Sequence, residues 1–344
     1  MRKLLVVLVL IFLFAGCSGK PSLVIYTWSD MFPQEVLDGF EKETGIRLRY
    51  VNFDTNETMI AKLKAAKGGK YDLVIADDYM IENIIDEELA QKLDRSQLPN
   101  FGNINPLYQR QFYDPSDEYT IPYGAGVQTI VYDPQKINIP IRGYIDLWNP
   151  SLMQKVGIID NFRVINGMAL KVMGQSYNTN DLAVIQSAGE LLKSLAPNIR
   201  LIRDNGLENE LLSGEIAAAV MYTSQVTAAK MEKPALRIVF PSEGIGFGIM
   251  AAFIPVKAPN AGAAHQFLNY ILDAKRGADC FMNMGYYSTF SASDKYIDAE
   301  YRDFLTLPED FKNFSAMEMI QNVSPDAEAL HNRVWTEFKS VTGR

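Results

Sequence analysis

Residues 46–79 read IRLRYVNFDTNETMIAKLKAAKGGKYDLVIADDY, and this stretch decides the fold class of the chain. The apolar run from Ile46 to Val51 is followed by a helical pattern that starts near Thr55 or Asn56, where a polar side chain can cap the first turn. A Gly-Gly pair ends this pattern, and the run Tyr71 to Ile75 then predicts a buried strand. The order strand, helix, strand is typical of a mainly parallel sheet covered by helices.

The same alternation continues on both sides of this stretch. Toward the N-terminus, Leu23 to Tyr26 is a short apolar run, and a helix is expected from Pro33 to Gly45. Further along the chain we expect strands at Val156 to Ile159, Ile216 to Met221 and Arg237 to Phe240, and helices at Asn166 to Met173 and Asp181 to Leu195. The pattern as a whole predicts the α/β class.

Two further apolar runs, Gln128 to Tyr132 and Phe247 to Ile254, predict strands that pass between two lobes. Two lobes are expected because 344 residues exceed what one hydrophobic core comfortably holds. We assign residues 23–126 plus 251–295 to lobe 1 and residues 127–250 plus 296–344 to lobe 2. Two crossovers of this kind would form a hinge.

The first residues have the plan of a bacterial export signal, because a basic pair precedes the apolar run Leu4 to Phe14. That run is shorter than the roughly 20 apolar residues that a membrane-spanning helix needs. Small residues precede Cys17 as in a lipobox, although Phe14 stands where Leu is usual. We predict that residues 1–16 are removed and that Cys17 is lipidated. Residues 17–22 then tether the protein to a membrane, in the periplasm or on the outer face of the cell. An ordinary signal peptide with an incidental cysteine is the alternative.

Charge and cysteine content narrow the classes of function. The chain has 41 acidic residues against 33 basic ones, which argues against nucleic acid and weakly favours a cationic ligand. If Cys17 is acylated, Cys280 has no partner for a disulfide. The only histidines, His265 and His331, have no cysteine at zinc-binding spacing. We therefore expect no nucleic-acid partner, no metal and no cofactor.

Polar and aromatic side chains follow the predicted strands, where ligands bind in open α/β sheets. The segments that follow four of these strands are Trp28-Ser29-Asp30, Asp77-Asp78-Tyr79, Asp160-Asn161 and Tyr222-Thr223-Ser224. Carboxylates, hydroxyls and aromatic rings together suit an ammonium group, through charge-assisted hydrogen bonds and cation–π contacts. The sequence therefore predicts a site for a small cation at these strand ends.

Each of these segments also has another interpretation. Trp28 could belong to the core, and Asp30 or Asp77 could cap the helix that follows its strand. The same carboxylates could act as acid and base in an enzyme such as a glycosidase. No carboxylate pair is singled out, however, and no nucleophile, metal motif or phosphate-binding loop accompanies them, so we predict a binding protein and not an enzyme.

The chain resembles the extracytoplasmic spermidine/putrescine-binding proteins of ABC importers over nearly its whole length. The strings that carry the resemblance are YTWSDMFP, FEKETGI, TNETMIAKLK, YDLVIADDY, EYTIPYGAG, IDLWNP, MALKVMG, FPSEGIGF, QFLNYIL and MGYYST. The resemblance implies a periplasmic-binding-protein fold, with two α/β lobes, two strand crossovers and a ligand cleft between the lobes. It also implies a polyamine ligand, such as putrescine or spermidine, and delivery to the permease subunits of an importer. We expect the protein to act as a monomer.

The resemblance also carries binding residues over to this chain. Trp28, Ser29 and Asp30 match the first ligand-contacting stretch, Tyr286 matches an aromatic contact, and Gln321 resembles a polar contact near the C-terminus. The predicted ligand-binding residues are Trp28, Ser29, Asp30, Asp77, Asp78, Tyr79, Asn161, Tyr222, Tyr286 and Gln321.

Several positions depart from the family pattern. Asn161 and Val164 stand where two carboxylates are typical, Gly248 replaces an aromatic wall, and Met250 replaces the Asp that usually anchors an amine. We interpret these changes as a second-lobe wall without carboxylates. The ligand would then be a short diamine such as putrescine, or a cation with a single charged head.

Two other functions stay open at this point. The adjacent Tyr286 and Tyr287 could bind ferric iron as paired phenolates in a receptor of the same architecture. Core packing plus one cleft aromatic is the favoured interpretation of this pair, because no His or carboxylate partner is evident nearby in the sequence. The chain could also be a surface lipoprotein that senses or adheres and transports nothing.

Overall fold

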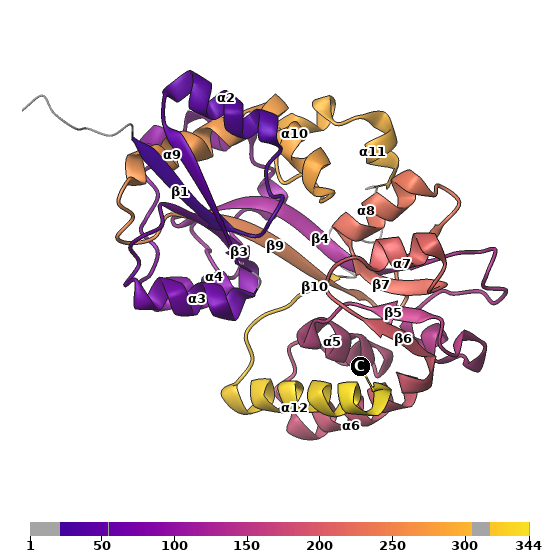
Figure 1. Ribbon diagram of the computed structural model, residues 1–344. Coiled ribbons are helices and arrows are strands. Elements are labelled where there is room, and N and C mark those ends of the chain that lie inside the picture. The colour runs from indigo at the N-terminus through magenta and orange to yellow at the C-terminus, as the bar shows by residue number, and fades with distance from the viewer. Residues whose placement is uncertain (1–20, 54, 305–316, 344) are drawn as a thin grey trace, which may run out of the picture.

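The computed structural model describes residues 21–53, 55–304 and 317–343. The predicted signal peptide at 1–16 and the lipidation site Cys17 lie outside the described residues. Figure 1 shows two lobes, each built on strands with helices on both sides, and a pair of long strands that joins them. The predicted α/β class and the two-lobed architecture are confirmed.

The strands and helices have the following bounds. The strands are β1 (Ser22–Thr27), β2 (Arg47–Asn52), β3 (Leu73–Asp77), β4 (Thr120–Tyr132), β5 (Val156–Ile158), β6 (Ile199–Ile202), β7 (Ala218–Tyr222), β8 (Arg237–Val239), β9 (Ile245–Phe253) and β10 (Met317–Met319). The helices are α2 (Gln34–Thr44), α3 (Asn56–Ala65), α4 (Asp78–Asp86), α5 (Phe162–Val172), α6 (Leu182–Leu195), α7 (Leu207–Ser213), α8 (Thr223–Glu232), α9 (Ala261–Ile271), α10 (Ala274–Met284), α11 (Ala299–Phe304) and α12 (Pro325–Thr342).

The strands follow the order β2-β1-β3-β9-β4-β7-β5-β6, with β10 beside β9 and β8 beside β4. In the first lobe, β1 is parallel to both β2 and β3, and in the second lobe β5 is parallel to both β6 and β7. The two long strands are antiparallel to each other and to their other neighbours in this order, since β9 pairs with β3 and β4, and β4 also pairs with β7. The carboxyl ends of the parallel strands therefore face the region between the lobes.

Side chains along the first-lobe strands point alternately to the two faces of the sheet, and a layer of helices covers each face. Ile25 packs with Phe40 of α2 and Phe267 of α9 on one face of the sheet. The next residue, Tyr26, packs with Leu63 of α3 and with Ile81 of α4 on the other face. Successive side chains of a strand point to opposite faces, so an uninterrupted apolar run is what a strand buried on both faces requires.

Residues at the helix ends determine where α2 ends and where α3 begins. Gly45 ends α2 in the left-handed conformation, with φ 72°, as a C-terminal glycine can. Thr55 begins α3, because its side chain accepts a hydrogen bond from the backbone nitrogen of Thr58. These helices start and end close to where the sequence predicts.

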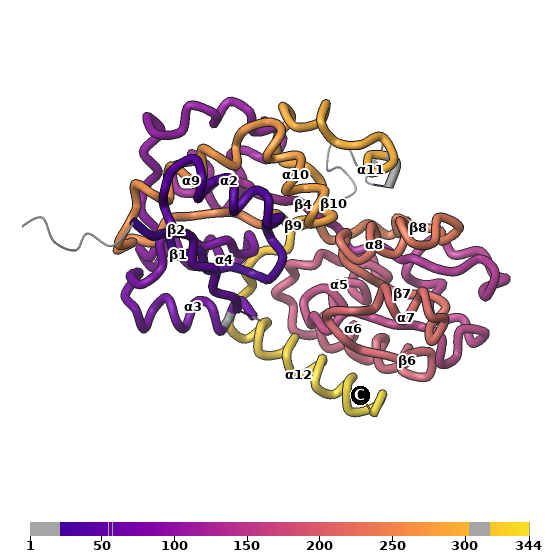
Figure 2. The backbone as a smooth tube through the Cα atoms, turned by 45° about the horizontal axis from the view of Figure 1, so that its top comes forward, coloured from indigo at the N-terminus to yellow at the C-terminus, as the bar shows by residue number. Residues whose placement is uncertain are grey.

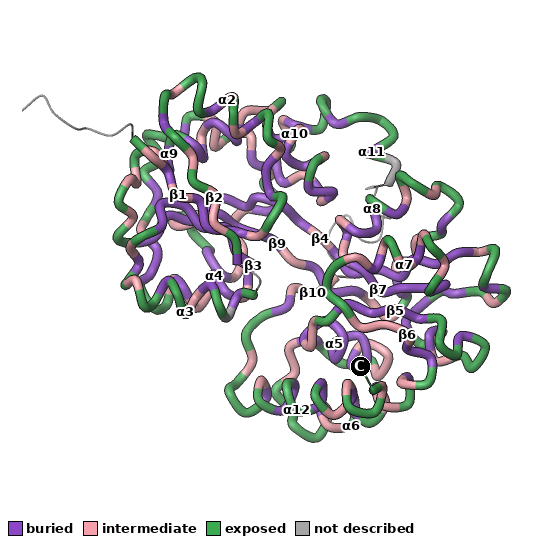
Figure 3. Tube along the Cα trace, in the orientation of Figure 1, coloured by how far each residue is buried: buried purple, intermediate pink, exposed green. Residues whose placement is uncertain are grey.

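The connection between the lobes consists of β4 and β9. Residues 120–127 of β4 pair with β9, and residues 128–132 of the same strand pair with β7 of the second lobe. Both strands are buried along nearly their whole length, as Figure 3 shows for the segment that runs from one lobe to the other. The two predicted crossovers are therefore the two central strands of the sheet.

The C-terminal part of the chain packs on the second lobe. Figures 1 and 2 show α12 lying along α5 and α6. Ahead of it, β10 is parallel to β9, with Glu318 opposite Gly246. The short helix α11 packs on α10, because the hydroxyl of Tyr301 donates to the carbonyl of Phe281 at 3.2 Å, and it also contacts α8. The residue limits of the two lobes stay a prediction.

Candidate functional site in the cleft between the lobes

A cavity of about 520 Å³ lies where the two lobes meet. Every predicted ligand-binding residue except Gln321 lines it. The lining also includes the residues Asn56, Gly126, Asp160, Arg163, Val164, Asp204, Gly248, Met250 and Asn283, among others. A cavity of this size suits a small molecule.

The first wall begins with the segment after β1. The ring of Trp28 packs against Phe53, with centroids 4.4 Å apart, so that part of the indole belongs to the core and part faces the cavity. Asp30 is exposed and has φ 58°, a left-handed conformation that Asp adopts more readily than most residues. Asn283 of α10 donates to the backbone carbonyl of Asp30 at 2.8 Å and so holds this turn at the cleft.

Asp77 ends β3, and its carboxylate is held by Asn56. The sequence predicts Asn56 only as a possible start of a helix. The Nδ2 atom of Asn56 donates both to Oδ2 of Asp77, at 2.8 Å, and to the hydroxyl oxygen of Tyr79, at 2.9 Å. Asp77 makes no side-chain capping bond to α4, so the capping interpretation is wrong for this residue. Its carboxylate lies in the cavity wall instead.

Asp78 is buried beside it, with only 3% of its surface exposed. Its carboxylate accepts hydrogen bonds from the backbone nitrogen atoms of Tyr79, at 2.8 Å, and of Ile249, at 2.9 Å. Burial raises the pKa of Asp78 to about 8, the bond from Ile249 lowers it, and the nearby charge of Asp77 raises it. Asp78 therefore joins the start of α4 to the crossover strand β9.

The second wall begins with Asn161 and Tyr222. Asn161 caps α5, because Oδ1 accepts from the backbone nitrogen of Val164 at 3.1 Å. Its Nδ2 donates to the hydroxyl oxygen of Tyr222 at 3.0 Å. The side chain of Asn161 thus orients the Tyr222 ring and is already engaged at both ends.

Two carboxylates on this wall correct the prediction that it carries none. Asp160 follows β5 and Asp204 follows β6, and both line the cavity. Asp160 is engaged by α12, since its Oδ1 lies 3.2 Å from Nζ of Lys339 and accepts from Nε1 of Trp335 at 3.1 Å. Asp204 has no ion-pair partner among the residues that the structure describes.

Met250 lies on the first-lobe side of the cavity and not on the second-lobe wall, where the sequence interpretation places it. It lies opposite Asp77 in the antiparallel pairing of β3 with β9, and its side chain belongs to the first-lobe core. Sequence alone could not reveal this pairing, because it joins strands that are far apart along the chain. The absence of an acid at position 250 therefore changes the surroundings of Asp77 and not the opposite wall.

Tyr286 lies against the crossover strand β4. A Cβ atom at Gly126 would be 2.7 Å from Cε1 of its ring, so the ring covers that glycine closely. Burial raises the pKa of the Tyr286 hydroxyl to about 12, while a hydrogen bond with Ser224 lowers it. The next residue, Tyr287, is buried in the second-lobe core and does not line the cavity. The two phenols therefore do not form the paired site that the iron hypothesis requires.

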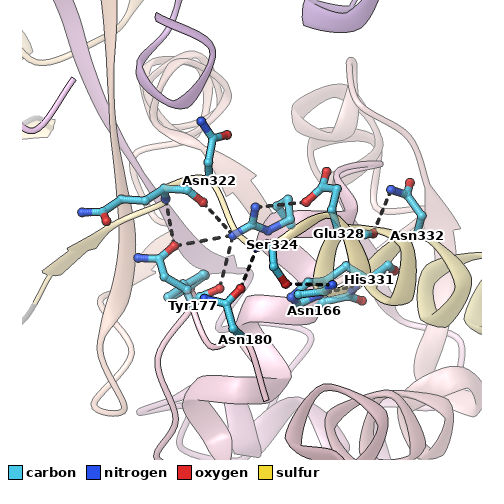
Figure 4. A network of polar contacts seen from close by, with 12 residues as sticks. Asn166, Tyr177, Asn180, Asn322, Ser324, Glu328, His331 and Asn332 are labelled. Atoms are coloured by element: carbon cyan, nitrogen blue, oxygen red, sulfur yellow. Dashed lines mark hydrogen bonds and ion pairs between the residues drawn. The ribbon is translucent and has the colours of Figure 1, made fainter. Parts of the chain in front are cut away.

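Arg163 and Gln321 belong to a network at the edge of the cavity. Nη2 of Arg163 donates to the backbone carbonyl of Gln321 at 3.0 Å, and its Nη1 lies 3.3 Å from Oε2 of Glu328. Figure 4 shows this network, in which Asn166 of α5 also bonds to His331 of α12, and Asn180 bonds to Ser324. The arginine therefore fastens the C-terminal segment to α5. Gln321 is exposed and does not line the cavity, although the preceding Ile320 does.

Among the described residues, no helix has both the length and the apolar character needed to cross a membrane. Within residues 21–53, 55–304 and 317–343, no three His, Cys, Asp or Glu side chains are grouped so that they could hold a metal ion.

Comparisons with known proteins agree with this geometry. A profile of the bacterial extracellular solute-binding protein family matches residues 35–304. This chain belongs to that family. The family name describes its members as solute-binding proteins, and the cavity between the lobes of this chain has a size that suits a small molecule.

Two curated relatives and one solved structure illustrate the similarity. The spermidine/putrescine-binding periplasmic protein of Salmonella typhimurium is 32% identical over 331 residues, which covers 95% of this chain and 94% of the relative. The protein of the same name from Escherichia coli K12 is 31% identical over 326 residues, with 93% and 88% covered. The spermidine/putrescine ABC transporter substrate-binding protein PotD of Streptococcus pneumoniae superposes with a TM-score of 0.82 at 26% identity, covering 94% of this chain and 99% of that one.

Proposed function

We propose that this protein captures a small cationic amine, with putrescine or spermidine as its ligand, and delivers it to the permease subunits of an ABC importer. The observation that carries the proposal is the lining of the cleft, where carboxylates and aromatic rings face one cavity from both lobes. Among the described lining residues, Arg163 is the one with a cationic side chain, and it is paired with Glu328. The cleft is therefore negatively charged, as an ammonium ligand requires.

The chemistry of each wall supports an amine. Asp30 and Asp77 offer charge-assisted hydrogen bonds, which are roughly twice as strong as neutral ones. The rings of Trp28 and Tyr286 present faces over which an ammonium or a methylene stem can lie, each contributing about 0.5 to 2 kcal/mol. The names of the curated relatives add support, since they are described as spermidine/putrescine-binding proteins.

The proposed place of action is outside the cytoplasm. The relatives from Salmonella typhimurium and Escherichia coli are called periplasmic. The lipobox-like residues before Cys17 support a lipid anchor, with the mature protein held as a monomer at the membrane surface near its permease. In this role the protein binds and releases its ligand and catalyses no reaction.

Calorimetry on protein from which bound ligand has been removed tests the proposal. Putrescine or spermidine is expected to bind tightly, and choline and arginine more weakly. Asp30→Asn is expected to lower amine affinity by about tenfold or more, because a neutral amide replaces a charged acceptor. Glu232→Gln, at the exposed end of α8 and outside the cavity, provides a control with the same change in charge. Heat from none of the amines, or full affinity in Asp30→Asn, would overturn the amine proposal and leave a receptor for another solute.

A further inference from the structure

The second-lobe wall contains a carboxylate whose charge no part of the described protein neutralises. Asp204 lies in the loop after β6, and β6 runs beside β5, as Figure 1 shows. Ile202 at the end of β6 is paired with Ile158 of β5, which brings Asp204 next to Asp160. Asp160 is engaged by Lys339, whereas Asp204 has no cationic partner in residues 21–53, 55–304 and 317–343. A carboxylate in this position can be neutralised by a ligand.

The loop that carries Asp204 is held in place toward the cavity. Nε2 of Gln225 donates to the backbone carbonyl of Asp204 at 2.9 Å. Oε1 of the same Gln225 accepts from the backbone nitrogen of Tyr222 at 3.3 Å, so one buried side chain ties the loop to the start of α8. Asp204 is exposed, yet partial loss of solvent raises the pKa of its carboxyl, a hydrogen bond with Tyr222 lowers it, and the charge of Asp160 raises it. The site thus holds a carboxylate in surroundings that favour an added cation.

An independent observation on the opposite wall also points to a ligand. Asn56 is 4% exposed and lines the cavity. Its Nδ2 atom is occupied by Asp77 and Tyr79, which fixes the orientation of the amide. Its Oδ1 atom is buried and has no hydrogen-bond partner within the described chain. A buried acceptor without a donor is rare in folded proteins, and an ammonium group beside Asp77 would supply the missing donor.

We propose that Asp204 is the second-lobe anchor of the ligand, so that one ammonium group of a diamine is held by Asp77 and Asn56 and the other by Asp204. This inference rests on the proposed function and sharpens it, because it assigns the second charge to a residue that the strand-end prediction did not include. The protein then selects amines that carry a cation at each end over amines with one cation. Specificity follows from the unpaired charge that a single-headed ligand would leave in the cleft.

A comparison of putrescine with butylamine separates the contribution of the Asp204 anchor from that of the anchor at Asp77 and Asn56. Butylamine has the same carbon chain and only one ammonium group, and its weaker binding can be followed by NMR titration. Asp204→Asn is expected to lower the affinity for putrescine by about tenfold or more and to leave the affinity for butylamine unchanged. Asp77→Asn is expected to lower both affinities. Glu232→Gln, on the same lobe but outside the cavity, is the control for charge and is expected to change neither.

A change in the preferred length of the diamine provides a second readout, which a purely structural role of Asp204 would not produce. Asp204→Glu lengthens the side chain and narrows the distance between the two anchors, so preference is expected to move from putrescine toward diaminopropane. Unchanged putrescine affinity in Asp204→Asn, or equal losses for putrescine and butylamine, would overturn the inference. A wild-type protein that binds neither putrescine nor spermidine would instead overturn the proposed function itself.

Discussion

The carboxylate of Asp78 accepts a hydrogen bond of 2.9 Å from the backbone nitrogen of Ile249. Asp78 is the first residue of α4 in the first lobe, and Ile249 belongs to β9, which continues into the second lobe. The bond therefore joins the wall of the cleft to a strand of the hinge. The carboxyl group of Asp78 is buried, so its protonation state affects the stability of this part of the protein.

We predict that Asp78 makes stability depend on pH. The folded-state pKa is about 8, because burial outweighs the two backbone hydrogen bonds, whereas an unfolded chain titrates this group near pH 4. Between these values the folded state binds more protons, so the contribution of Asp78 to the free energy of unfolding falls as pH rises from about 4 to about 8. Asp78→Asn removes this contribution, and its stability should fall less steeply over that range than that of the wild type. Urea unfolding at several pH values measures the two slopes.

The exposed Asp38 of α2 provides the matched control for this experiment. Asp38→Asn removes the same charge from the same lobe and is expected to keep the wild-type slope. Parallel slopes for Asp78→Asn and the wild type would show that Asp78 is ionised in the folded protein throughout the range.

We predict that Gly126→Ala weakens ligand binding by about tenfold. The new methyl group would lie 2.7 Å from Cε1 of Tyr286, and an aromatic ring cannot absorb that overlap without moving out of its place in the cavity wall. Gly124→Ala on the same strand is the comparison. There the nearest atom is Cε of Met250 at 3.1 Å, at the flexible end of a side chain, so a smaller loss is expected. Calorimetric titration of both variants measures the difference, and equal losses would contradict the role of the Tyr286 ring.

We predict that Asn322 slows release of the ligand. Its Nδ2 atom donates to Oε2 of Glu82 at 2.9 Å and to Oδ1 of Asn83 at 3.1 Å, which connects the segment before α12 to α4 of the first lobe. Asn322→Ala removes these contacts and is expected to raise the dissociation rate by about three- to tenfold, since each exposed hydrogen bond contributes about 1 kcal/mol or less. Stopped-flow measurements provide the rate.

Asn332→Ala serves as the control, because the Asn332 side chain donates to the backbone carbonyl of Glu328 in its own helix, α12, and to no first-lobe residue among those that the structure describes. Small-angle scattering adds a second readout. Ligand is expected to reduce the radius of gyration of the wild type, and Asn322→Ala should require more ligand for the same change. An unaltered dissociation rate would show that this contact does not restrain the lobes.

We predict that Cys17 is the acylated N-terminus of the mature protein. Cys17→Ser should release the protein into the soluble extracytoplasmic fraction, because the acyl chains that hold it at the membrane cannot be added. Mass spectrometry of the wild type should show the mass of the lipid. A variant that stays with the membrane, together with a wild type without acyl mass, would contradict the anchor.

The expectation that ligand-binding residues follow the carboxyl ends of strands predicts most of the first-lobe wall of the cavity and only part of the second-lobe wall. β1 and β3 are continuous apolar runs, so the polar segments after them were easy to identify. β6 is an edge strand that contains Arg200, and three of its four residues are only partly buried. An edge strand does not need a continuous apolar run, and β6 was therefore not predicted. Asp204 follows this strand, so the sequence pattern offers no strand end that would point to it.

Other residues of the cavity do not follow the carboxyl end of a parallel strand. Asn56 is the first residue of α3, Gly126 is in the middle of β4, and Met250 is in a strand antiparallel to β3. The pairing of β3 with β9 is set by tertiary contacts between distant segments, and local periodicity carries no information about it. The resemblance to a known family supplied Tyr286, which no local pattern would have selected.

The partner of β3 determines the order in which the protein can be completed during synthesis. Val74 of β3 is paired with Phe253 of β9, so the inner edge of the first-lobe sheet stays open until the chain has been made as far as β9. By then β5 to β8 of the second lobe already exist. Contacts this distant along the sequence form slowly, because a long loop must close before they can stabilise anything. The lobe whose residues come first in the sequence therefore cannot close its sheet before the strands of the other lobe have been synthesised.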